Sequence, residues 1–302
     1  MTDSTAWLNG STLPFRQLQI PVWDLGVVAG ASISEMARTY LHKPFRMAEH
    51  VERLVQSCNE LGFDLPYDSE QLITAAEDLV VCNSADIGSD EDLGIVWFVT
   101  AGANATYLGA ETLPGPSVGI HTFRLPFELW AKAADQGVAL RVPAIRQMSA
   151  STLPIHRKLR NRLHWWLADR QANEIEAGAR AILVDEDGHL TETSTSAFYA
   201  VIDGGIVTPK NNVLNSMSRR MVEAAANDLQ IPFEAANLSL DDVNSFDHAF
   251  LSSTPSGLMP VRTLGEHVFP TCDLIDRLLV WWKKETGINP RDQIRAGAGR
   301  SS

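Results

Sequence analysis

Two neighbouring stretches decide how this chain folds: STLPIHRKLRNRLHWW, residues 151–166, and ARAILVDEDGHLTETSTSAFY, residues 179–199. The second stretch is rich in strand-forming residues and contains Asp187-Gly188, a dipeptide typical of tight hairpin turns. It therefore predicts two antiparallel strands, with Glu192 near the end of the second. The first stretch carries Lys158, and its apolar residues recur at helical spacing, which predicts a helix over 158–177.

The rest of the C-terminal half continues this mixed pattern. Strand-like runs occur as VALRVPAI, FYAVI, IVTP, IPFEAAN and HAFLSS. Helical patterns cover 218–229 and 273–286. We therefore expect a large, β-rich domain with helices over residues 137–290, followed by a disordered tail over 291–302.

The N-terminal part predicts a separate, smaller domain. LQIPV, ISEMARTYL, LGIVWFVTAG and SVGIHTF read as strands, and helical patterns cover 48–62 and 69–81. Residues 125–136 combine proline, polar residues and glycine between two strand-like runs, which is typical of a linker. The expected fold class is therefore α+β, with a small α/β domain over 1–124, a linker over 125–136 and a boundary near Leu125.

Charge and composition exclude several classes of protein. The 302 residues carry a formal net charge of −12, and nucleic-acid-binding proteins usually present a basic face, so no nucleic-acid partner is expected. No basic segment followed by an apolar stretch opens the sequence, and no run of 18 apolar residues occurs, so we expect a cytoplasmic chain without a membrane partner. The three cysteines are widely spaced, which favours reduced thiols over disulfides or a metal site.

Lys158 and Glu192 together suggest a specific chemistry. A lysine that forms a Schiff base and a carboxylate that keeps a pyridine nitrogen protonated are the two groups that a pyridoxal phosphate enzyme needs most. Each residue alone has a simpler interpretation, since HRKLRNR also reads as a solvated, basic start of a helix and a glutamate in a hairpin is usually exposed. Their combination favours the chemical interpretation.

Two downstream segments are candidates for holding a phosphate. In NVLNSMSRR a loop leads into a helix, whose first turn offers backbone N–H groups at Met217 and Ser218. The Ser218 hydroxyl either adds a bond or caps the helix. In SSTPSG, Thr254 follows a strand and is placed to do the same. Serine-rich turns and helix caps are common, so neither segment is decisive by itself.

The order of these motifs resembles the fold-type IV, or class IV, family of pyridoxal phosphate enzymes, which includes branched-chain and D-amino acid aminotransferases and aminodeoxychorismate lyases. The resemblance runs through 23–54, KLRNRL, TETSTSAF, VLNSMSRR and LSSTPSG. It implies that Lys158 forms the Schiff base with pyridoxal 5′-phosphate, that Glu192 pairs with the ring nitrogen and that Leu214 packs on the ring. It also implies that the phosphate is held by Arg53, Met217, Ser218 and Thr254, between two domains of a homodimer subunit.

Departures from the family pattern concern the substrate. The entry motif reads GASISE, so Ala31 and Ser34 replace an acidic and an aromatic residue. Pro255 follows Thr254 where relatives offer a backbone N–H to the substrate carboxylate, and proline has none. Arginine binds carboxylates through two parallel hydrogen bonds, so Arg38 and Arg162 are candidate cations for binding the substrate. The substrate-binding candidates are Ser34, Arg38, Arg162, Pro255 and Ser256, and the histidines show no metal-ligand spacing.

The resemblance predicts an aminotransferase that moves an amino group between an amino acid or amine, with branched-chain amino acids among the candidates, and a 2-keto acid. An alternative is an aminodeoxychorismate lyase-like elimination of pyruvate, because Asn161-Arg162-Leu163 after Lys158 resembles the lyase motif. A third interpretation is a pyridoxal phosphate-binding protein without catalytic activity, because the usual carboxylate-binding positions are lost.

Overall fold

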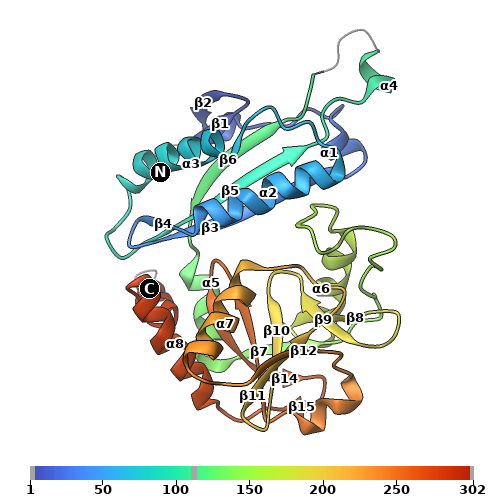
Figure 1. Ribbon diagram of the computed structural model, residues 1–302, viewed down its shortest axis with the longest axis vertical. Coiled ribbons are helices and arrows are strands. Elements are labelled where there is room, and N and C mark those ends of the chain that lie inside the picture. The colour runs from blue at the N-terminus through green and yellow to red at the C-terminus, as the bar shows by residue number, and fades with distance from the viewer. Residues whose placement is uncertain (1–3, 110–113, 300–302) are drawn as a thin grey trace. The chain divides into compact units, whose positions relative to one another are not determined.

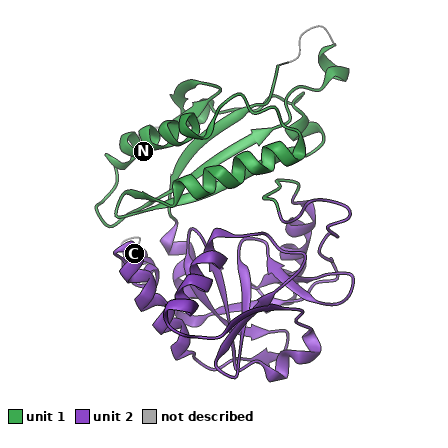
Figure 2. Ribbon diagram, viewed as in Figure 1, with its two compact units in different colours: residues 1–125, 157–161 green, residues 126–156, 162–302 purple. Residues whose placement is uncertain are grey.

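A computed structural model describes residues 4–109 and 114–299, which form two compact units (Figure 2). Unit 1 comprises residues 1–125 and 157–161, and unit 2 comprises residues 126–156 and 162–302. The chain thus leaves unit 1 after Leu125, returns to it for five residues around Lys158, and leaves it again. Both units combine helices with a sheet, in agreement with the predicted α+β fold class.

Unit 1 is built on an antiparallel sheet in the order β2-β1-β6-β5-β3-β4 (Figure 1). The strands are β1 (Thr5–Leu8), β2 (Ser11–Pro14), β3 (Ser32–Tyr40), β4 (Lys43–Phe45), β5 (Leu93–Thr100) and β6 (Val118–Arg124). Residues 18–22, predicted as a strand, follow the 3-10 turn Phe15–Gln17 and pair with no neighbour, so that prediction is wrong.

Two helices, α2 (Met47–Leu61) and α3 (Ser69–Ser84), cover one face of this sheet. Each has clear end signals: Gly62, with φ 70°, closes α2, and a capping box between Asp68 and Gln71 opens α3. Side chains alternate along a strand, so Ile33 and Ala37 of β3 pack into the core beneath the helices while Ser34 points to the other face. The short helices α1 (Leu25–Val28) and α4 (Ala105–Leu108) complete the unit.

Unit 2 contains a nine-stranded mixed sheet in the order β12-β11-β10-β13-β14-β7-β8-β9, with β15 paired to β14. Its strands are β7 (Val138–Arg141), β8 (Arg180–Val184), β9 (Leu190–Thr193), β10 (Ala197–Ile202), β11 (Gly205–Pro209), β12 (Phe233–Ala236), β13 (His248–Ser253), β14 (Gly257–Leu264) and β15 (His267–Val268). The predicted hairpin is present as β8 and β9, and Gly188 takes a φ of 84° in its turn.

Five α-helices and a 3-10 turn accompany the sheet of unit 2. They are α5 (Phe127–Gln136), α6 (Leu163–Ile175), α7 (Met217–Asp228), η2 (Leu240–Ser245), α8 (Asp273–Thr286) and α9 (Pro290–Ala298). The stretch predicted as a linker is therefore mostly the helix α5. Its Phe127 ring lies so close to Gly297 of α9 that a Cβ there would meet the ring at 2.4 Å.

The C-terminal stretch corrects the prediction of a disordered tail. Asn289 accepts a hydrogen bond from the Arg291 backbone N–H, and Pro290 occupies the first helical position, so α9 has a well-defined start. Ile294 is buried, which anchors the helix. Residues 300–302 lie outside the described part of the chain.

The helix predicted over 158–177 begins five residues later than expected. α6 starts at Leu163, and its buried residues are Trp165, Ala168 and Ala172, whereas Leu163 and Trp166 are 65% and 60% exposed. The helical spacing of the apolar residues predicts a buried face that includes Leu163 and Trp166, and this prediction is wrong, because the buried face is the one that carries Trp165, Ala168 and Ala172. Within the described ranges, no helix has the length and apolar character needed to cross a membrane.

Candidate active site

The segment around Lys158 is part of the unit 1 sheet rather than of a helix. Ser34 donates its backbone N–H to the Lys158 carbonyl at 3.0 Å, and Arg160 donates to the Ser32 carbonyl at 2.9 Å. These bonds flank an antiparallel bridge between Ile33 and Leu159. The edge of β3 thus gives this segment the backbone hydrogen-bond partners that a helix would otherwise give it. The segment can therefore be extended although its sequence pattern is helical.

This pairing determines the direction of the Lys158 side chain. Leu159 packs with Ile33 against the core beneath α2 and α3. Neighbouring residues of an extended segment point to opposite faces, so Lys158 and Arg160 project from the other face, beside Ser34. A hydrogen bond from the Leu159 N–H to the Arg157 carbonyl bends the backbone tightly at Lys158. We call the face that carries Ser34, Met36, Phe98 and His121 the Ser34 face.

Arg53 lies on the opposite face of the same unit. It makes two 2.6 Å hydrogen bonds to the Glu35 carboxylate, and His50 Nδ1 lies 3.0 Å from the same carboxylate. Burial raises the pKa of Glu35, but the charges of Arg53 and His50 outweigh it and hold that pKa well below its usual range. The sequence singled out Arg53 and missed Glu35, its buried partner.

Arg38 is buried on β3. It donates to the Thr39 carbonyl at 2.8 Å, lies 3.4 Å from Asp92, and stacks 4.0 Å over the Tyr40 ring. Asp92 also accepts a 2.6 Å hydrogen bond from the Thr39 hydroxyl. This network ties the start of β5 to β3, a structural task that the sequence did not indicate.

In unit 2, Glu192 and Leu214 are joined directly. Glu192 Oε1 accepts a hydrogen bond from the Leu214 backbone N–H at 3.1 Å. One oxygen of the carboxylate on β9 is therefore used to hold the loop that precedes α7. Arg162 sits at the start of α6 and donates to the Ser194 carbonyl, two residues after Glu192.

The first turn of α7 fits a phosphate group. Met217 and Ser218 are its first two residues, so their backbone N–H groups have no acceptor within the helix, and both residues are buried. Ser216, not Ser218, is the cap, because its side chain accepts from the Arg219 backbone N–H at 3.1 Å. The Ser218 hydroxyl is thus available for other bonds.

A row of hydroxyls leads to Ser218. Ser252 on β13 donates to Ser218 at 2.9 Å, and the Tyr199 hydroxyl lies 2.8 Å from Ser252. Burial raises the pKa of Tyr199, so this hydroxyl stays protonated and donates to Ser252, which has no other proton to share. Ser218 consequently keeps its own proton for Ser216, 3.2 Å away, or for an anion.

The turn between β13 and β14 carries the remaining candidates from the sequence. Thr254 and Pro255 are partly exposed, two and three residues beyond Ser252. Ser256 is buried, and its hydroxyl lies 2.7 Å from that of Ser253. The turn therefore lies next to the hydroxyl row that ends at α7.

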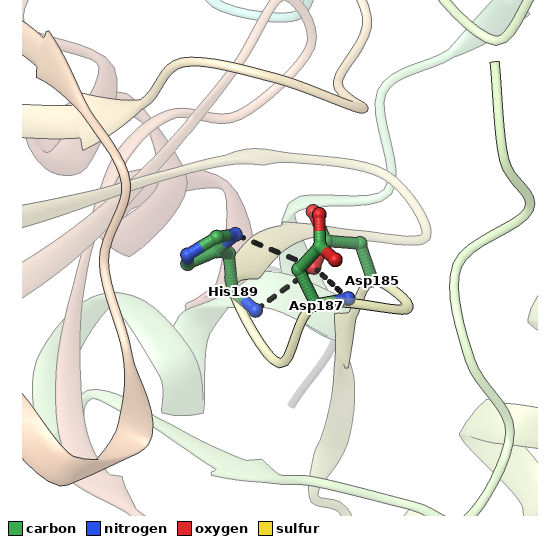
Figure 3. A group of neighbouring side chains, drawn as sticks. All are labelled: Asp185, Asp187 and His189. Atoms are coloured by element: carbon green, nitrogen blue, oxygen red, sulfur yellow. Dashed lines mark hydrogen bonds and ion pairs between the residues drawn. The ribbon is translucent and has the colours of Figure 1, made fainter.

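Three side chains in the β8–β9 turn have the composition of a metal site, namely Asp185, Asp187 and His189 (Figure 3). Asp185 explains the cluster without a metal, because its carboxylate accepts from the backbone N–H groups of Asp187 and His189 at 3.1 and 2.9 Å. Its other oxygen accepts from the Asn212 amide at 2.9 Å. The cluster closes the turn and attaches it to the loop that leads into α7.

Comparisons with known proteins identify the family and the fold. A model of the family described as amino-transferase class IV matches residues 32–264. D-alanine aminotransferase of Staphylococcus epidermidis is 31% identical over 266 residues, which cover 87% of this chain and 90% of that protein.

Two solved structures share the fold. Branched-chain aminotransferase from Thermoproteus uzoniensis, solved with norvaline, has a TM-score of 0.84 at 23% identity and covers 94% of this chain and 95% of that chain. 4-amino-4-deoxychorismate lyase from Pseudomonas aeruginosa has a TM-score of 0.75 at 23% identity over 94% of this chain and 100% of that chain. Since the family match extends from β3 to β14 and includes Lys158, Glu192 and α7, the chain belongs to the class IV amino-transferase family.

Proposed function

We propose that this class IV amino-transferase binds pyridoxal 5′-phosphate and moves an amino group from an amino acid or amine to a 2-keto acid. The observation that carries the proposal is the backbone pairing between Ser34 and Lys158, from which strand alternation directs the Lys158 side chain to the Ser34 face. When bound, the cofactor supplies an aldehyde for the amino group and an electron-withdrawing ring.

The residues of the chain have distinct tasks in this proposal. The Lys158 amine anchors the cofactor and, once displaced, carries a proton to and from the reacting carbon. Glu192 keeps the ring nitrogen protonated, and its bond to Leu214 fixes the residue that packs on the ring. Met217, Ser218 and Thr254 hold the phosphate. The family resemblance adds Arg53, whose guanidinium is bonded to Glu35 on the face opposite the Ser34 face.

The side chain of the donor is not restricted by an aromatic residue at position 34. Ser34 is small and buried, opposite Phe98 on the neighbouring strand. The relative from Staphylococcus epidermidis is named for D-alanine, so both enantiomers of alanine, glutamate, leucine and valine belong in the donor panel.

A test of the proposal begins with colour. Protein incubated with the cofactor is expected to turn yellow, and borohydride is expected to fix the colour to the peptide that contains Lys158. Lys158→Ala should abolish the fixation, whereas Lys43→Ala, which removes an exposed lysine of the same unit, should not. Fixation at another lysine would contradict the proposal.

The reaction type is tested by the need for an acceptor. Transfer of the amino group requires 2-oxoglutarate or pyruvate, whereas release of pyruvate from aminodeoxychorismate without any acceptor would support the lyase. The lyase remains the second candidate because Asn161-Arg162-Leu163 resembles the lyase motif, and Arg162 lies near Glu192 in unit 2. Bound cofactor without either reaction would support a non-catalytic binding protein.

On the family resemblance we further propose that the enzyme is a cytoplasmic homodimer. Sedimentation of the purified protein is expected to give twice the mass of the 33.2 kDa chain, and fractionation of the source cells tests the location.

A further inference from the structure

Arg160 differs from the arginines that surround it in sequence. Arg157 forms an ion pair with Glu60, and Arg162 donates to the Ser194 carbonyl. Among the described residues, no carboxylate lies within ion-pair distance of Arg160, and desolvation alone lowers the pKa of its guanidinium. The side chain is exposed, but protein atoms around the guanidinium remove part of its water without supplying a negative charge.

The position of Arg160 relates it to Lys158. Both residues flank Leu159, whose side chain packs into the core, so both side chains project from the Ser34 face. Two residues along an extended segment span roughly 7 Å. The Arg160 guanidinium is therefore close enough to bind the carboxylate of a small amino acid or keto acid whose reacting group lies at Lys158.

A second polar group lies on the same face. His121 is opposite Val96, which is opposite Met36 of β3. Burial lowers the pKa of His121, and the positive charge of Arg160 lowers it further, so the imidazole is neutral at neutral pH and lies within electrostatic range of the guanidinium. Its Nδ1 atom is buried and has no hydrogen-bond partner among the described residues.

The acidic residues near this face are already paired. Asp92, at one end, contacts Arg38 and Thr39, and Asp24, at the other end, accepts hydrogen bonds from the Thr100 and Ser117 hydroxyls at 2.9 Å each. Neither Asp24 nor Asp92 is therefore placed to form an ion pair with Arg160. An exposed guanidinium without a carboxylate beside it can pair with a carboxylate ligand through two parallel bonds.

We propose that Arg160 binds the carboxylate of the substrate, on the face that also carries His121. This inference rests on the proposed aminotransferase function and assigns to it a specificity residue that the motifs did not indicate. Arg160 takes the role for which Arg38 and Arg162 were candidates from the sequence. The ligand is a carboxylate, either the one next to the reacting carbon or the distal one of a dicarboxylic substrate.

The test compares Arg160→Gln, Arg160→Lys and the unsubstituted full-length protein, each loaded with the cofactor. Arg124→Gln is the matched control, because it removes an exposed arginine from β6 of the same unit. For Arg160→Gln we expect kcat/KM for carboxylate substrates to fall by about 10- to 100-fold, mainly through KM, with partial recovery in Arg160→Lys. The absorption spectrum of the cofactor, the thermal midpoint and the rate of the first half-reaction with sec-butylamine, which has no carboxylate and needs no keto acid, should not change.

The substrate panel separates the two carboxylates. A loss with both alanine and glutamate assigns Arg160 to the carboxylate next to the reacting carbon, and a loss with only glutamate and 2-oxoglutarate assigns it to the distal one. Either result supports the proposal. No loss, or an equal loss with sec-butylamine, would overturn it.

Binding of glutarate, an unreactive dicarboxylate, distinguishes this inference from the proposed function. If the unsubstituted protein transfers no amino group, the proposed function fails, and calorimetry with glutarate still decides the role of Arg160. Binding that weakens by about tenfold in Arg160→Gln but not in Arg124→Gln supports it. Absent binding, or equal binding by all variants, contradicts it.

Discussion

Glu35 on β3 and Arg53 on α2 form a buried, two-bond ion pair, in which both hydrogen bonds measure 2.6 Å. The pair crosses from the sheet to the helix that covers it, and His50 contacts the same carboxylate. A buried charge that loses its partner is costly, so the pair fixes the orientation of Arg53 before any ligand arrives.

Replacing Glu35 is expected to destabilise the protein strongly. Glu35→Gln leaves Arg53 buried without its counter-charge, and we expect a loss of about 3–5 kcal/mol in the free energy of unfolding. Urea denaturation followed by tryptophan fluorescence measures it. The control is Glu52→Gln, an exposed glutamate of α2, which should change stability by less than about 0.5 kcal/mol. Equal stability of the two variants would show that the pair does not hold α2 to the sheet.

The same pair gives the protein a specific response to acid. The pKa of Glu35 is depressed in the folded state, so its stabilisation is fully present above the unfolded value, near 4.3, and is lost as the pH falls toward the lower folded value. Stability should therefore decline below about pH 4 in the unsubstituted protein. The difference in unfolding free energy between the unsubstituted protein and Glu35→Gln should become smaller as the pH falls through that range. A constant difference from pH 7 to pH 3 would argue against this linkage.

Glu192→Gln is expected to slow the chemistry without loss of the fold. The glutamine can still accept the Leu214 N–H through its oxygen, but it brings no negative charge to the ring nitrogen. We expect the rate of the first half-reaction, followed by absorbance in a stopped-flow instrument, to fall on the order of 100-fold. An unchanged rate would remove Glu192 from its proposed role. An unchanged thermal midpoint confirms that the fold is intact.

Ser218→Ala is expected to weaken binding of the cofactor phosphate. It removes the hydroxyl that receives the proton of Ser252 and offers its own to an anion. We expect the Kd of pyridoxal 5′-phosphate, measured by quenching of tryptophan fluorescence, to rise about tenfold. Tyr199→Phe is the matched control, since it removes a hydroxyl at the far end of the row and should lower stability rather than affinity. Equal affinities of Ser218→Ala and the unsubstituted protein would contradict the role.

Asp185→Ala is expected to loosen the loop that leads into α7. The substitution removes the acceptor of two backbone N–H groups and of the Asn212 amide, and we expect a loss of about 2–3 kcal/mol in unfolding free energy. The cofactor should also bind more weakly, because Asn212 precedes the phosphate-binding turn. Asp187→Ala, an exposed residue of the same turn, should have little effect on either quantity. Urea denaturation and fluorescence titration measure the two.

Binding of Zn²⁺ distinguishes a metal site at the Asp185 turn from a turn that is closed by hydrogen bonds alone. If the turn were a metal site, added Zn²⁺ would raise the thermal midpoint of the protein, and Asp187→Ala would abolish the rise. We expect no such shift, because the Asp185 oxygens are already hydrogen-bonded within the turn and to Asn212.

The sequence by itself determined the fold class, the β8–β9 hairpin and the family. Hairpin turns, capping residues and strand patterns depend on a few neighbouring residues, so they can be predicted without the tertiary structure. The resemblance to the family depends on the order of the motifs around Lys158, Glu192 and α7. These local signals do not contain long-range pairings.

Only the tertiary structure decided the conformation at Lys158 and the partners of the charged residues. The segment around Lys158 has helical spacing, yet the unpaired edge of β3 offers it hydrogen bonds that override its local preference. That pairing turns Arg160 to the same face as Lys158, a relation that a helix would not have given, because residues two apart on a helix do not share a face. The ion pair between Glu35 and Arg53 likewise forms only when α2 packs on the sheet, because the two residues lie on different elements.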